Sequence, residues 1–260
     1  MSSLAKTRGI LLRHSAYSET SRVLHWFTED FGRISTVAKG AMRPRNPLLG
    51  QCDQLYTCEV VFYHHERETA YITREVTPLA VRPRLRTDWR AALGGLYLAD
   101  LAARATPPHV AAPDVFRLLH DALDVLGDHG WRAPVPLLFE IRLLTLLGLA
   151  PQLDQCAACD RELDAGSSAR FEARQGGLVC PRCASAGSPD VMAPDVLAIL
   201  RHWQRAEGWT LARTARCQSQ QLSAMADALG LFIAYHLDIL PNGRATTLAT
   251  VFAPPPRVAA

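Results

Sequence analysis

Two pairs of cysteines have the spacing of a metal site. Cys156 and Cys159 form one C-x₂-C pair, Cys180 and Cys183 form a second, and residues 160–179 separate them. Two residues between thiols let one tight turn direct both sulfurs to one ion, and two such turns complete a tetrahedron with bonds of about 2.3 Å. The spacing predicts one structural zinc ion per chain, because four thiolates leave no open position for a substrate.

A redox dithiol and a catalytic zinc ion are the competing interpretations. A thioredoxin-like dithiol needs one C-x-x-C beside a βαβ pattern, whereas this chain has two pairs and no such pattern. His64-His65-Glu66 spells the H-x-E of zinc deaminases, but it lies far upstream, and no proline precedes either pair as that signature requires. The remaining thiols, Cys52, Cys58 and Cys217, are expected to pack in the interior.

A cluster of cations is the second candidate site. Lys39, Arg43 and Arg45 lie within seven residues, and no acidic residue follows until Asp53. This density favours contact with DNA phosphates over a merely solvated loop. Basic residues that could extend the surface are Arg8, Arg13, Arg22 and Arg33. Aromatics that could stack on bases are Trp26, Phe27, Tyr56, Phe62 and Tyr63, although each is more often a core residue in a small barrel.

Charge is distributed unevenly along the chain. Residues 1–86 contain 13 Lys and Arg against 8 Asp and Glu, a balance of +5, whereas residues 87–260 contain 15 against 17, a balance of −2. The first third is therefore expected to bind a polyanion, and the remainder to face protein partners. No nucleophile–base pair, phosphate loop or paired-carboxylate site is recognisable, so the chain is not expected to be an enzyme.

Two kinds of element must position these residues. Strands rich in β-branched and aromatic residues are predicted at residues 6–13, 22–28, 33–39, 55–63 and 69–76. Five short strands indicate a small barrel, with the OB barrel as leading candidate and a β-sandwich as the alternative. Helical spacing then predicts helices at residues 89–101, 115–126, 135–147, 194–204 and 219–240.

The expected organisation is multidomain β plus α. Residues 1–82 are predicted to form an OB-fold nucleic-acid-binding domain, and residues 83–260 a helical bundle with an inserted four-cysteine zinc module at about 151–190. The most apolar run, 137–149, is too short to span a bilayer, and the N-terminus has no signal-peptide core. We therefore expect a cytoplasmic protein, where paired thiols stay reduced.

The order of these parts resembles the RecO family of bacterial DNA repair and recombination mediators. The match spans about residues 4–240. It rests on Gly9-Ile10-Leu11-Leu12, the run from Tyr17 to Leu24, Phe27-Thr28 with Gly32, Val37-Ala38-Lys39-Gly40, Phe139-Glu140, Leu143-Leu144, Leu147-Gly148-Leu149, Pro151, Leu153 and Gly176-Gly177-Leu178-Val179, with the four cysteines. The departure is at 241–245, where only a weak echo of the family's basic ending is present.

The resemblance implies a nucleoid-associated mediator of the RecF pathway. Such a protein binds single- and double-stranded DNA, anneals complementary strands, and contacts RecR and the tail of the single-stranded DNA-binding protein. It helps to load RecA onto coated strands, and the resemblance leaves open whether RecF takes part. None of these activities needs a catalytic residue. The alternative is a zinc-ribbon transcription or translation factor, which would be expected to carry positive charge on the ribbon.

Overall fold

The computed structural model describes residues 3–64, 70–163, 169–185, 187, 191–238, 244, 248 and 249. The chain divides into two compact units, residues 1–130 and residues 131–260. Among the described residues, no helix combines the length and the apolar character needed to cross a membrane.

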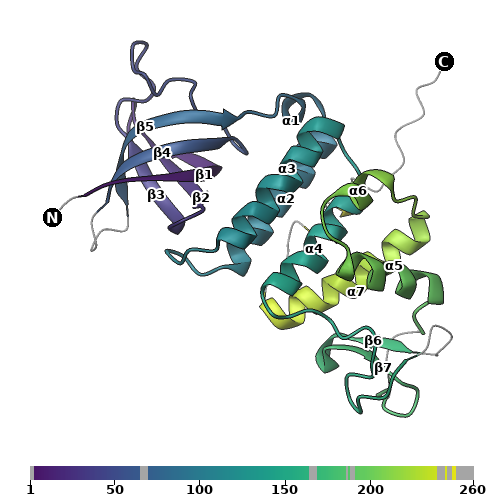
Figure 1. Cartoon of the computed structure of the whole chain (residues 1–260). Coiled ribbons are helices and arrows are strands. Elements are labelled where there is room, and N and C mark those ends of the chain that lie inside the picture. The colour runs from purple at the N-terminus through teal and green to yellow at the C-terminus, as the bar shows by residue number, and fades with distance from the viewer. Residues whose placement is uncertain are drawn as a thin grey trace, which may run out of the picture. The chain divides into compact units, whose positions relative to one another are not determined.

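The first unit begins with a closed five-stranded barrel (Figure 1). Its strands are β1 (Ser3–Ala16), β2 (Arg22–Thr28), β3 (Gly32–Ala38), β4 (Thr57–His64) and β5 (Tyr71–Ala80). They close in the order β1-β2-β3-β5-β4, and all pairs are antiparallel except β3 with β5. Five strands closed in this way form an OB barrel, so the predicted fold is confirmed and the β-sandwich alternative is wrong.

Aromatic side chains fill the barrel. Trp26 and Phe62 are fully buried within a hydrophobic cluster that includes Leu11, Leu24 and Ile34. The buried indole Nε1 of Trp26 donates to the Thr36 hydroxyl at 3.0 Å, and that hydroxyl also accepts from Thr73 at 2.8 Å. Because its one polar atom is paired, the large ring can occupy the core without an unsatisfied donor.

Three helices complete the first unit: α1 (Arg84–Thr87), α2 (Trp89–Ala105) and α3 (Pro113–His129). Arg82 ties them to the barrel. Its buried guanidinium donates to Asp124 of α3 at 2.7 Å, and to the Leu55 carbonyl and the Thr57 hydroxyl at 2.9 and 3.0 Å. Burial lowers the pKa of Arg82, while Asp124 acts in the opposite direction. Secondary structure changes near residue 82, but packing keeps α1, α2 and α3 with the barrel up to residue 130.

The second unit contains α4 (Pro134–Leu146), α5 (Pro194–Arg205), α6 (Thr210–Thr214) and α7 (Ser219–Leu237). Between α4 and α5 lie β6 (Arg170–Glu172), the 3₁₀ turn η1 (Ala173–Gln175) and β7 (Gly177–Val179). Helix α4 is buried on nearly every side, as its continuous apolar sequence predicts.

One charge lies inside this apolar helix. Glu140 is fully buried, and its two carboxylate oxygens accept hydrogen bonds from Arg244 at 2.9 and 2.7 Å. A side chain on Gly230 of α7 would collide with the Arg244 guanidinium. Gly230 therefore leaves room for Arg244 to reach the carboxylate, and the buried charge is paired.

Candidate metal centre and nucleic-acid interface

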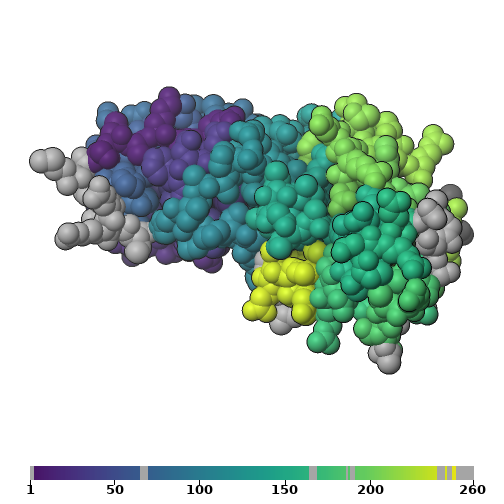
Figure 2. All heavy atoms as spheres, turned by 60° about the horizontal axis from the view of Figure 1, so that its bottom comes forward, coloured from purple at the N-terminus to yellow at the C-terminus, as the bar shows by residue number. Residues whose placement is uncertain are grey.

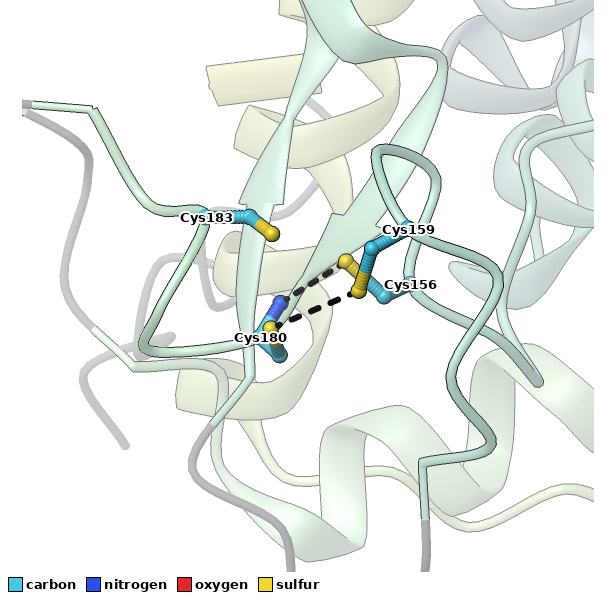
Figure 3. Close-up of side chains that lie close together, drawn as sticks. All are labelled: Cys156, Cys159, Cys180 and Cys183. Carbon is cyan, nitrogen blue, oxygen red and sulfur yellow. Dashed lines mark hydrogen bonds between the residues drawn. The ribbon is translucent and has the colours of Figure 1, made fainter.

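The four cysteines of the two C-x₂-C pairs lie together, as predicted (Figure 3). All four sulfurs lie within 4.8 Å of one another, and the sulfurs of Cys159 and Cys180 are 3.9 Å apart. Tetrahedral bonds of about 2.3 Å place neighbouring sulfurs about 3.8 Å apart. The donor set and its spacing fit a bound metal ion with four thiolate ligands.

Both pairs use the same turn. The Cys156 carbonyl accepts from the amides of Cys159 and Asp160 at 3.3 and 2.8 Å, and the Cys180 carbonyl accepts from Cys183 and Ala184, both at 3.0 Å. The Cys180 amide also donates to the Cys156 sulfur at 3.3 Å. Two equivalent turns facing each other explain why the x₂ spacing brings four sulfurs to one point.

The β6–β7 hairpin lies between the two turns in the sequence. Gly177 has φ +153, and a Cβ on this residue would overlap the Gln152 backbone. That approach allows Leu178 to donate to the Gln152 carbonyl at 2.8 Å, and Gln152 to donate to the Gly176 carbonyl at 2.9 Å. The hairpin is thereby fixed against the segment that enters the first cysteine pair.

The four thiols do not share negative charge evenly. Burial acts to raise the pKa of Cys156, but backbone amides of Cys180 and Ala158 and hydrogen bonds from Cys159 outweigh it and lower the pKa to about 6. Hydrogen bonds with Cys159 and Cys180 raise the pKa of Cys183 to about 12. Four thiolates this close repel one another, so full deprotonation of the set requires a cation among them.

The segment around the cysteines, residues 154–183, contains five acidic and four basic residues, and arginines of α5 anchor it. Asp154 pairs with Arg201 at 3.2 Å and with Arg205 at 2.6 Å. Arg201 also donates to the carbonyls of Leu153 and Leu163, both at 2.8 Å. The sequence alone did not single out these arginines, although a half-buried arginine on an amphipathic helix is a common sign of such an anchor. These contacts hold the segments around the cysteines against α5.

The H-x-E motif is only partly described by the structure. His65 and Glu66 fall outside the described residues. His64 ends β4 in the barrel unit, where its ring lies 5.0 Å from that of Tyr71. The cysteines belong to the other compact unit.

The cationic loop follows β3. Lys39, Arg43 and Arg45 are all exposed, and no ion pair within the described parts of the chain involves any of them. Consecutive turns order the loop: Arg43 donates its amide to the Gly40 carbonyl at 2.9 Å, and the Asn46 side chain donates to the Lys39 carbonyl at 3.2 Å. Three unneutralised cations are thus displayed on an ordered backbone.

The other four basic residues differ in how firmly they are held. Arg8 forms two 2.7 Å hydrogen bonds to Glu29, which raise the pKa of Arg8 and lower that of Glu29, and it lies over the Phe116 ring. Arg22 contacts His14 at 2.8 Å and the Met42 sulfur at 3.0 Å.

Arg13 and Arg33 lie near each other on the barrel. Arg13 is exposed, and Arg33 is half-buried and donates to the Thr106 carbonyl at 3.1 Å. Both line one pocket of the first unit. The basic residues of the barrel therefore form at least two groups, the cationic loop and this pocket.

Most of the aromatics considered for base stacking belong to the core. Trp26, Phe27 and Phe62 are fully buried, and Tyr56 packs under Arg86 with the guanidinium 5.0 Å from the ring centroid. Tyr63 is 38% exposed. Tyr17, which the sequence did not single out for stacking, is 64% exposed.

An OB barrel, a set of helices and a module with four clustered cysteines define a class, the OB-barrel proteins that carry a four-cysteine module. Family models divide the chain in the same way: Recombination protein O N terminal matches residues 1–80, and Recombination protein O C terminal matches residues 86–244. The chain therefore belongs to the RecO family, as the order of its motifs predicted. This membership supports a role in DNA repair.

Individual relatives agree with the family models. A DNA repair protein RecO from Moorella thermoacetica is 28% identical over 247 residues, which cover 94% of this chain and 91% of the relative. One from Rubrobacter xylanophilus is 33% identical over 204 residues, covering 76% and 79%. One from Alkaliphilus metalliredigens is 26% identical over 236 residues, covering 90% and 94%. The similarity thus extends over both compact units.

Proposed function

We propose that this protein is a mediator of DNA repair and homologous recombination in the RecF pathway. It binds single- and double-stranded DNA, anneals complementary strands and, with RecR, helps to load RecA onto coated single strands. The observation that carries the proposal is the ordered loop with Lys39, Arg43 and Arg45 exposed and unneutralised on an OB barrel. Annealing requires two polyanions to approach, and a basic surface that screens phosphate repulsion is sufficient for it without a catalytic residue.

The proposed cofactor is one structural zinc ion on Cys156, Cys159, Cys180 and Cys183. Tetrahedral four-thiolate sites are typical of zinc in structural modules. Bound there, the metal supplies the positive charge that four close thiolates need. The acidic module opposes phosphate contact, which favours the mediator over the alternative, a zinc-ribbon transcription or translation factor.

The salt dependence of DNA binding tests the proposed role of the cationic loop. Replacing Lys39, Arg43 and Arg45 together by Ala is expected to flatten the slope of log K against log salt on duplex DNA by about 2 to 3 units, because each phosphate contact releases condensed counterions. Annealing should slow in parallel. Titrations at several salt concentrations measure the slope, and metal content and thermal stability should hardly change, because exposed loop cations contribute little to folding.

A control variant that removes three positive charges elsewhere distinguishes a specific DNA-binding surface from a general effect of net charge. Arg174, Arg213 and Arg216 are exposed residues of the second unit. Their triple Ala variant removes the same charge and is expected to keep the parental slope. An unchanged slope in the loop variant would instead show that the loop is only solvated, and would direct the search to Arg13 and Arg22.

We further propose that the second unit binds the tail of the single-stranded DNA-binding protein. Leu231 and Tyr235 lie one turn apart on α7 and are 59% and 54% exposed, and the C-terminal half of α7, yellow in Figure 2, reaches the surface of the unit. Leu146, at the end of α4, is 46% exposed, and α4 packs against α7. Exposed apolar residues on packed helices favour a peptide that is apolar as well as acidic.

Calorimetry with the tail peptide tests this surface. The full-length chain is expected to release heat on binding, and Leu231→Asp is expected to weaken binding at least about tenfold, because it adds a charge that repels an acidic peptide to an apolar contact. Leu79→Asp makes the same change at a leucine of β5 that is 53% exposed, and it should bind normally. Equal affinities of the two variants would place the tail elsewhere.

A further inference from the structure

A pocket of about 670 Å³ lies within the first unit, between the barrel and α2. Arg13 of β1, Arg33 of β3 and Arg104 of α2 line it, as do His25 of β2 and His109 of the α2–α3 connection. Helix α2 packs beside the barrel (Figure 1). The pocket therefore uses strands β2 and β3, the face on which OB barrels hold oligonucleotides, but a helix adds a second wall.

The pocket carries net positive charge. Three arginines face a single carboxylate among its lining residues, that of Asp100, which pairs with Arg104 at 2.8 Å. No ion pair in the described part of the chain involves Arg13 or Arg33. Burial and the nearby charge of Arg13 lower the pKa of His25, so this histidine adds no charge at neutral pH. Counting only the arginines and the carboxylate, the formal charge of the lining is +2.

Arg33 is held in place without a carboxylate. Its Nη2 donates to the Thr106 carbonyl at 3.1 Å, and its Nε is the one buried side-chain nitrogen that lacks a hydrogen-bond partner among the described residues. A guanidinium has five donors, and the fold leaves several of these unpaired. Fixed arginine donors are suited to phosphate oxygens.

The α2–α3 connection lies against the start of β3 at the pocket. The His109 amide donates to the Arg33 carbonyl at 3.2 Å, and Pro108 forms a bridge with Arg33. Gly32 has φ +62, and a Cβ there would overlap the Val110 backbone. The α2–α3 connection is thus held against the start of β3, where its residues Pro108 and His109 line the pocket.

We propose that this pocket binds a terminal phosphate monoester of a single DNA strand. The inference rests on the proposed DNA binding and adds recognition of the strand end. A terminal monoester has about −1.5 to −2 charge at neutral pH and three acceptor oxygens, which match a lining of +2, whereas an internal diester carries only one charge. The apolar side chains of Leu96 and Pro108 offer a wall to the terminal nucleoside.

Binding to strands that differ only at their ends tests the proposal. The probes are internally labelled single DNA strands of 20 nucleotides with a 5′-phosphate, with a 3′-phosphate, or with hydroxyls at both ends. Their affinity for the protein is measured by fluorescence anisotropy at pH 7.5. The parental full-length chain is expected to bind one of the phosphorylated strands about tenfold more tightly than the hydroxyl strand, as expected for additional charge-assisted hydrogen bonds. The phosphate position that strengthens binding identifies the end that enters.

Matched variants assign the preference to the pocket. Arg13→Gln with Arg104→Gln removes one strand and one helix arginine, both exposed, and should abolish the preference. Arg74→Gln with Arg117→Gln makes the same change at exposed residues of β5 and α3 that do not line the pocket, and should retain it.

Three outcomes overturn the proposal. Equal binding of all strands by the parent refutes end recognition and leaves DNA binding intact. A preference that persists in the Arg13→Gln/Arg104→Gln variant places the phosphate elsewhere. Failure to bind any strand, at low salt as well, refutes the proposed function together with this inference.

Discussion

Replacing Glu140 by Ala is expected to lower the free energy of unfolding of the second unit by about 3–5 kcal/mol, the cost of leaving a buried charge without its partner. The carboxylate is fully buried, and Arg244 binds it through two hydrogen bonds. Its removal therefore leaves the Arg244 guanidinium in the core without this counter-charge. Thermal and denaturant unfolding followed by circular dichroism measure the loss. A change below about 1 kcal/mol would contradict the assignment.

Two further variants distinguish the loss of the Glu140–Arg244 ion pair from the loss of a glutamate or a change in packing. Glu207→Ala removes an exposed glutamate of the same unit and is expected to change stability by less than about 0.5 kcal/mol. The double variant Glu140→Met with Arg244→Met replaces both charges by unbranched apolar side chains and is expected to recover most of the lost stability. A double variant as unstable as Glu140→Ala would show that the destabilisation comes from altered packing rather than from the stranded charge.

Replacing Cys180 by Ser is expected to reduce the metal content from one ion per chain toward none. Three thiolates bind a tetrahedral ion far more weakly, and the apparent free energy of a structural zinc site is about 10–16 kcal/mol, so the cysteine module should lose its fold. Elemental analysis of reduced protein measures the metal, and limited proteolysis between residues 151 and 190 reports the loosened module. A variant that keeps both metal and protease resistance would refute the site.

The matched control is Cys217→Ser. This cysteine is half-buried and outside the cluster, so its replacement should leave the metal content unchanged. The salt slope of DNA binding should remain parental in both cysteine variants, because the proposed phosphate contacts come from the barrel unit. A flattened slope in Cys180→Ser would assign part of the DNA surface to the module.

Local patterns predicted the elements well. Arg22–Thr28 is the second strand in both prediction and structure, and the helices that begin at Trp89, Pro134, Pro194 and Ser219 follow the apolar spacing. The C-x₂-C spacing predicted that the four sulfurs lie together, because the turn that joins each pair is made by consecutive residues. The short helices α1 and α6 were not predicted, since four or five residues contain too little periodicity.

Contacts between residues that are distant along the chain could not be predicted from the sequence. The sequence alone does not show which arginines have a carboxylate partner. Glu29 binds Arg8, whereas no described carboxylate pairs with Arg45. Arg33 and Arg104 lie far apart along the chain and line one pocket only after α2 has packed on the barrel. Glu140 within an apolar helix did carry a signal, because a charge among ten buried residues needs a partner, but the identity of Arg244 depends on tertiary structure.

The Glu140–Arg244 pair also sets an order of events in folding. The two residues are 104 positions apart, so α4 is synthesised long before its carboxylate can be neutralised. Until residue 244 arrives, the helix either remains exposed or buries the Glu140 charge without its arginine partner. The segment between Glu140 and Arg244 forms a long loop that can close only late. The final packing of α4 and α7 is therefore expected to be a slow, non-local step. The nascent second unit is therefore expected to depend on protection from aggregation longer than the barrel, whose strand pairs join much nearer neighbours.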